Sequence, residues 1–101
     1  MAKFTNDDLG VSFTLPDNPT VGQQLRYRGR VFATGYFTED VYLRMWLGFL
    51  GLYSDWECES VPDPKAVDLE AETNPAVADI VQFVGNITAR HMNTLEAVPK
   101  N

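Results

Sequence analysis

The side chains best suited to acid–base or nucleophilic chemistry are the single histidine, His91, and the single cysteine, Cys58. A histidine beside a cysteine can form a nucleophilic pair, because the imidazole takes the thiol proton. However, Glu57 and Glu59 flank Cys58, and their negative charge disfavours the reactive thiolate. His91 falls on or beside the apolar face of a predicted helix, where packing or capping is its commoner role. We therefore expect both residues to be structural.

The acidic residues suggest a second kind of chemistry, the binding of a metal ion. Asp68, Glu70 and Glu72 alternate along the chain as the oxygen ligands of a calcium loop do. Such a loop also needs a glycine at its sixth position and a glutamate at its twelfth, where this chain has Thr73 and Asp79. The sequence also lacks a glycine-rich phosphate loop followed by Lys-Ser/Thr. It therefore predicts a protein that is not an enzyme and binds no metal or cofactor.

Composition and charge narrow the range of partners. The chain has 101 residues, of which 45% are hydrophobic, and this is enough for one globular domain with a core. The net charge of -6 repels nucleic-acid phosphates and anionic membrane surfaces. One cysteine forms no internal disulfide. We therefore expect neither nucleic acid nor membrane as a partner.

Two stretches bear on the compartment. Residues 1–8 lack the apolar centre of a secretory signal. The most apolar run, 41–53, has 13 residues and includes Arg44, whereas a membrane span needs about 20 apolar residues. We therefore expect a cytoplasmic protein and read the apolar run as part of a buried or partner-facing helix.

The elements that must position these side chains begin with an N-terminal extended segment, 1–19. Within it, residues 11–15 alternate apolar and polar side chains as a half-buried strand does. Thr20 is a predicted N-cap for a helix over 21–33. Arg26, Arg28 and Arg30 alternate, as they would on one face of a strand. Helix and strand therefore both stay open for this stretch.

The rest of the chain is predicted to be helical apart from one acidic loop. Helices are expected over 39–54 and over 75–95, the second of them opened by Asn74 as N-cap and Pro75 at the first helical position. Between them lies an acidic loop at about 57–73, broken by prolines. The predicted fold is mostly α, a single small domain of three main helices over 20–101 after the short N-terminal segment or strand.

The helix predicted over 39–54 is apolar on nearly every side, and such a helix must be covered on nearly every side. Two helices and one short strand cover only part of it, so an apolar patch should remain for a protein partner. The residues expected to contact that partner are Tyr42, Trp46, Phe49, Leu50 and Tyr53. The alternative, that these residues fill the core of the monomer, stays open.

The same helix carries Gly48 and Gly51 on one face. Either another helix approaches closely there, or this face is simply exposed to water. The sequence alone leaves both explanations open.

Charge is distributed unevenly between the two halves of the chain. Residues 1–53 are neutral overall, so the whole net charge of -6 lies in residues 54–101. The basic and acidic patches could meet within one molecule or between neighbours in a homo-oligomer. The residues expected to mediate self-association are Arg26, Arg28, Arg30, Asp68, Glu70 and Glu72.

Three parts of the chain, taken in order, carry a resemblance to a known family. They are FTLPDNPTV at 13–21 with QQL at 23–25, DWEC at 55–58 with PDP at 62–64, and a third part from NP at 74–75 through HM at 91–92 to LEAVPKN at 95–101. In these patterns of apolar and acidic positions the chain resembles the small tail assembly chaperones of long-tailed, siphovirus-like bacteriophages.

This resemblance implies a mostly helical, acidic, non-enzymatic protein of the host cytoplasm. Such proteins coat the tape-measure protein while tail tube subunits polymerise around it, and they are absent from the finished particle. Two alternatives stay open. One is a small acidic phage inhibitor of a host nuclease or defence complex, suggested by the acidic stretch 55–79. The other is a structural head–tail connector or tail completion protein.

Overall fold

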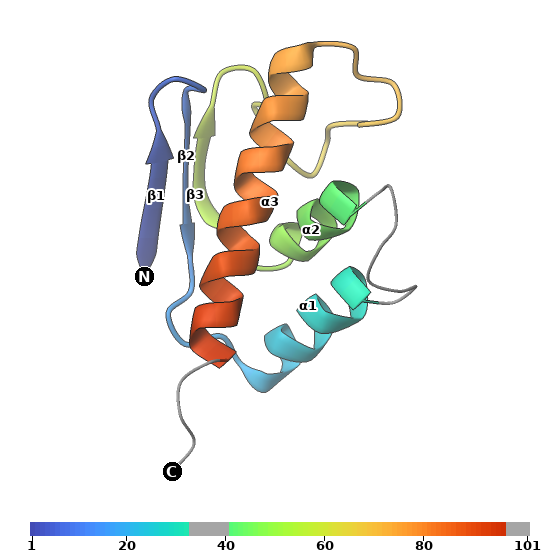
Figure 1. The fold of residues 1–101 in the computed structure, drawn as a ribbon. Helices are drawn as coiled ribbons and strands as arrows, with labels where there is room; N and C mark the ends of the chain where they lie inside the picture. Colours follow the sequence, from blue (N-terminus) through green and yellow to red (C-terminus); the bar gives the residue numbers. More distant parts are fainter. Residues whose placement is uncertain (33–40, 97–101) are drawn as a thin grey trace.

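The computed structural model describes residues 1–32 and 41–96 and shows an α+β fold (Figure 1). The elements in chain order are β1 (Ala2–Asn6), β2 (Val11–Leu15), α1 (Val21–Phe32), α2 (Val41–Leu50), β3 (Ser54–Cys58) and α3 (Pro75–Glu96). The strands form one antiparallel sheet in the order β1-β2-β3. The prediction of a mostly α fold with one short strand is therefore wrong.

The helices lie beside one another along the sheet (Figure 1). α3 runs along the sheet, and α2 and then α1 follow on the side away from β1. None of the helices in the described ranges is long and apolar enough to span a bilayer.

The first strand and its turn lie inside the predicted extended segment 1–19. Ala2, Phe4 and Asn6 are half-buried while Lys3 and Thr5 are exposed, the alternation of a strand with one covered face. The turn closes because the Leu9 amide donates to the Asn6 side chain at 3.1 Å. Gly10, at a φ of 65°, adopts the left-handed conformation that returns the chain into β2.

The third strand, β3, falls where the sequence predicted the end of a helix and the start of the acidic loop. Its pairing with β2 is irregular, because Ser12 faces Glu57 whereas Thr14 faces Ser54. Three steps along β3 therefore match two along β2, which makes a β-bulge. Asp55, at a φ of 52°, lies within the bulge in the left-handed region.

The conformation of Asp55 gives a stability prediction. Left-handed backbone costs about 1–2 kcal/mol for a residue with a β-carbon, although aspartate and glycine tolerate it best. We expect Asp55→Val to lower the free energy of unfolding by about 1–2 kcal/mol, and Asp55→Gly to leave it unchanged or raise it. Asp55 is exposed, so neither substitution alters the core. Urea denaturation of both variants tests this, and equal stability of the two would contradict the bulge geometry.

The three helices of the described residues overlap predicted ones, and two of them carry the predicted caps, but α2 ends at Leu50 instead of at residue 54. Residues 21–32 are helical, which decides between the two alternatives for that stretch in favour of the helix. α2 occupies 41–50, and residues 39–40 of the predicted helix lie outside the described residues. α3 begins at Pro75, and the Asn74 side chain accepts a hydrogen bond from the Ala76 amide at 3.1 Å.

Thr20 caps α1 through a reciprocal pair of hydrogen bonds. The Gln23 amide donates to the Thr20 hydroxyl at 3.1 Å, and the Thr20 amide donates to the Gln23 side chain at 2.8 Å. We expect Thr20→Ala to lower the free energy of unfolding by about 1 kcal/mol, because it leaves a helix donor without its partner. Urea denaturation measures this, and Thr5→Ala, on the exposed face of β1, is the matched control. An equal loss in the control would contradict a capping role.

The core lies between the sheet and the helices and centres on Phe13 of β2, which is fully buried. Its ring lies 5.2 Å from Phe49 of α2, 6.1 Å from Trp56 of β3 and 6.4 Å from Phe83 of α3. This aromatic cluster joins the sheet to α2 and α3. Other core side chains include Val11, Leu15, Trp46, Ile80, Val84 and Met92.

α2 lies between α1 and α3 at two glycines. A β-carbon on Gly48 would lie 2.8 Å from the Tyr27 ring of α1, and one on Gly85 would lie 3.0 Å from Met45 of α2. Gly48 is therefore a point of close approach between helices. Of the two explanations left open for the glycine face, close approach of another helix is the one that applies to Gly48. These contacts fix which side of α2 remains uncovered.

Candidate functional site

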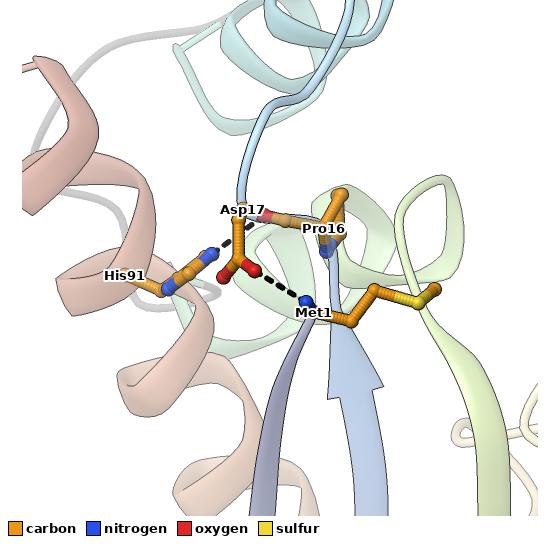
Figure 2. Close-up of polar contacts among 4 residues, drawn as sticks. All are labelled: Met1, Pro16, Asp17 and His91. Atoms are coloured by element: carbon orange, nitrogen blue, oxygen red, sulfur yellow. Dashed lines mark hydrogen bonds and ion pairs between the residues drawn. The ribbon is translucent and has the colours of Figure 1, made fainter.

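His91 of α3 contacts the residue that follows β2 and a ring of β1. Its Nε2 donates to the Pro16 carbonyl at 2.7 Å. The centroid of its ring lies 5.7 Å from that of Phe4, and the two rings are arranged edge to face. Figure 2 shows this bond beside the contact between the Met1 amino group and the Asp17 carboxylate. Both contacts hold the end of β2 in place, and the expectation of a packed histidine is confirmed.

Cys58 lies at the opposite end of the central strand. It pairs with Val11, the first residue of β2, whereas His91 contacts Pro16, just after the last. The two side chains are therefore separated by the length of β2 and form no nucleophilic pair. The residues that the structure describes contain no group of three or more histidine, cysteine, aspartate or glutamate side chains able to hold a metal ion.

The acidic segment between β3 and α3 is organised by its own carboxylates. Asp68 accepts a hydrogen bond from the Glu70 amide at 3.1 Å, and Glu72 accepts one from the Asn74 amide at 3.1 Å. At the start of the segment, the Trp56 indole donates to the Val61 carbonyl at 2.6 Å. These local bonds give the segment a turn structure.

The five residues predicted to contact a partner divide into two groups. Trp46 is only 2% exposed and Phe49 is fully buried, so both belong to the core. Leu50 and Tyr53 are half-buried, and Tyr42 is 38% exposed. The alternative that these residues fill the core of the monomer is therefore correct for Trp46 and Phe49. The other three of the five lie at the surface.

A groove lies between α2 and the segment that joins β3 to α3, lined by residues of both. Its central cavity has a volume of about 590 Å³. A cavity of about 510 Å³ adjoins it at Leu43 and Leu69, and one of about 610 Å³ adjoins it at Leu47 and Leu50. Val67 also lines the centre. We call these three adjoining cavities the α2 groove.

The wall that α2 contributes to this groove is a row of leucines. Leu43, Leu47 and Leu50 are spaced four and three residues apart, so they share one face of the helix. Leu47 is 50% exposed, although it lies between the buried Trp46 and Gly48. Leu43 and Leu47 were not predicted to contact a partner, and their spacing with Leu50 is the sequence signal that could have identified them.

Charged side chains surround this apolar row. The central cavity is lined by Arg30, Arg44 and Lys65 as well as by Asp68 and Glu70. One molecule thus brings basic and acidic groups to the same groove.

The six residues predicted to mediate self-association are therefore not two separate patches. Arg30, Asp68 and Glu70 line the central cavity, and Glu72 lines the adjoining one. Arg26 and Arg28 are exposed on α1 and line none of the three cavities. Self-association through these groups stays a prediction.

At the end of the groove nearest β3, Tyr53 lies under Lys65, whose Nζ is 5.6 Å from the ring centroid. Burial, and in second place the Asp63 carboxylate, raise the pKa of Tyr53 above its ordinary value. The phenol is therefore neutral near pH 7 and acts here as an apolar and hydrogen-bonding surface.

The α2 groove is lined by apolar side chains together with charges of both signs, and the histidine and the cysteine of the chain lie elsewhere. The chain matches no protein-family model, no curated protein and no solved structure with which it was compared, so its resemblance to tail assembly chaperones stays an expectation.

Proposed function

We propose that this protein binds an amphipathic α-helical segment of another polypeptide in the α2 groove, without catalysis. The observation that carries the proposal is the row Leu43, Leu47 and Leu50 beside cavities of several hundred Å³. A helix that docks into a groove offers apolar residues at the same three- and four-residue spacing. The ten residues of α2 extend about 15 Å, which corresponds to about three turns of a bound helix.

The biological setting proposed for this activity is the assembly of a phage tail in the host cytoplasm. A tail assembly chaperone must hold a long helical tape-measure protein and bring tail tube subunits to it. The groove suits helical segments of such a client, and the net charge of -6 would help to keep the loaded complex soluble. The support for this setting is the sequence resemblance together with the groove.

Two exposed leucines, each in a described part of a helix, provide a direct test of the groove. Leu47, 50% exposed, lies in it, and Leu25, 58% exposed, lies outside it on α1. The probe is a fluorescent 14-residue peptide, held helical by a hydrocarbon staple, with leucines at positions i, i+3, i+4 and i+7. A peptide of the same composition with scrambled leucine spacing is the control for the probe.

We expect Leu47→Glu to weaken binding of the probe about tenfold or more, because burying one leucine side chain is worth about 1.5–3 kcal/mol. Leu25→Glu changes the net charge equally and should leave the affinity unchanged. Fluorescence anisotropy measures both. Equal effects of the two variants, or equal affinity for the scrambled peptide, would rule out the groove as the binding site.

Two further measurements separate the chaperone from the other candidates. Mass spectrometry of purified phage particles should not detect a chaperone, whereas a connector or tail completion protein would be present. Binding through an apolar groove should persist at high salt, whereas an acidic inhibitor that imitates DNA should lose its target as salt rises. Detection in the particle would overturn the chaperone proposal while leaving the groove intact.

A further inference from the structure

The charges along the α2 groove are sorted by sign from one end to the other. The cavity at the C-terminal end of α2 is lined by Arg30 and Lys65 and, among the described residues, by no acidic side chain. The cavity at the N-terminal end is lined by Glu72 and Asp79 and, within the same described part of the chain, by no lysine or arginine. Side chains of both signs line the central cavity, between these two ends.

We infer that the groove selects both the charge pattern and the direction of the helix it binds, an inference that rests on the proposed function. The acidic end of the bound helix lies against Arg30 and Lys65, and its basic end lies against Glu72 and Asp79. Helices are most stable with acidic residues in their first turn and basic residues in their last. Such a helix binds antiparallel to α2, with its N-terminus at the Arg30 end.

The backbone dipoles favour the same direction. α2 ends at the Arg30 end of the groove, where its negative C-terminus faces the positive N-terminus of the bound helix. α3 begins at the other end, where Pro75 lines the cavity and its positive N-terminus faces the negative C-terminus of the bound helix. Side-chain charges and helix dipoles thus act together.

The Arg30 guanidinium has N–H donors that can bind an acidic side chain of the bound helix. Its Nη1 donates to the Leu47 carbonyl at 3.2 Å, which holds the side chain against α2. A guanidinium carries five N–H donors, so others remain for a carboxylate of the bound helix. The arrangement suits an acidic side chain in the first turn of the occupant.

The direction is tested with a stapled helical peptide that carries glutamates in its first turn, lysines in its last and leucines at i, i+3, i+4 and i+7. This leucine pattern is the same in both directions, so only charge and dipole choose the orientation. A nitroxide on the peptide N-terminus broadens nearby amide resonances of the isotope-labelled protein. We expect broadening at Gly51 and Leu52, next to the Arg30 end, and little at Ala76 and Ala78, next to the other.

A protein with one charge exchanged at each end, Lys65→Glu with Asp79→Lys, keeps the net charge and leaves each end with one charge of each sign. It should bind the same peptide roughly tenfold more weakly at low salt, or with the broadening divided between the two ends. The weakening should fade in 1 M salt, where screening extends over only about 3 Å. The matched control, Lys3→Glu with Glu57→Lys, makes the same exchange on the exposed face of the sheet and should behave as the unmodified protein.

The outcomes separate this inference from the function on which it rests. If the unmodified protein fails to bind the peptide, the proposed function fails. If it binds while both ends broaden equally or the N-terminus lies at the Glu72 end, only the inferred direction fails. If the exchanged variant binds and orients the peptide as the unmodified protein does, the charges at the ends play no part.

Discussion

Replacing Trp46 by alanine is expected to lower the free energy of unfolding by about 3–5 kcal/mol. The indole is only 2% exposed, and its ring lies 5.2 Å from Phe49 and 6.0 Å from Trp56. Removing it takes away the contacts that join α2 to the sheet and leaves a cavity that its neighbours fill only in part. A domain of this size has roughly 5–15 kcal/mol of stability in total, so the loss would populate the unfolded state.

Urea denaturation followed by circular dichroism measures this loss. The control is Leu47→Ala, one residue further along the same helix but half exposed. We expect that variant to keep its stability within about 0.5 kcal/mol and to bind the helical probe more weakly. The opposite pattern, with Trp46→Ala as stable as the unmodified protein and Leu47→Ala unfolded, would place the indole at an interface and overturn the packing described above.

The sheet explains why the sequence alone assigned Trp46 to a partner. In the predicted fold of three helices and one strand, the other elements are too few to cover a helix that is apolar on nearly every side. The structure adds β1 and β3 to the sheet, and Phe13 and Trp56 of this sheet contact Phe49 of α2. The sheet and α3 therefore cover the side that carries Trp46 and Phe49, and the leucine row remains on the groove side.

The helices were predictable because their signals are local. Thr20, Asn74 and Pro75 mark two helix starts within a few residues of sequence, and the structure shows the expected caps. The strands β1 and β3 have only five residues each, and their stability comes from pairing with β2. β3 is also distant from β2 in the sequence, and its residues fell between the end of the helix predicted over 39–54 and the start of the acidic loop predicted at about 57–73.

The groove was only partly predictable for a related reason. Leu50 and the acidic residues of the segment before α3 were identified, but Leu43 and Leu47 were not. In a helix that is apolar all round, periodicity does not say which face is covered. That choice is made by Gly48 and Gly85, where the backbone of one helix meets side chains of another, and these pairings depend on the whole fold.

Gly48 therefore carries the second large prediction. We expect Gly48→Ala to lower the free energy of unfolding by about 1–3 kcal/mol, because its β-carbon would lie 2.8 Å from the Tyr27 ring and 3.0 Å from Val31. The loss occurs although alanine is a better helix former than glycine by about 1 kcal/mol. The matched control is Gly29→Ala in α1, where nothing lies within 4 Å of the added atom, and it should raise the stability.

A double-mutant cycle assigns the cost to this contact. In a protein that already carries Tyr27→Ala, the ring is absent, so adding Gly48→Ala should cost little or restore some stability through helix propensity. The coupling between the two sites should exceed about 1 kcal/mol by urea denaturation. A Gly48→Ala variant as stable as Gly29→Ala, or additive effects with Tyr27→Ala, would show that α1 does not pack on α2 at this glycine. The position of Arg30, which α1 carries to the groove, would then lose its structural basis.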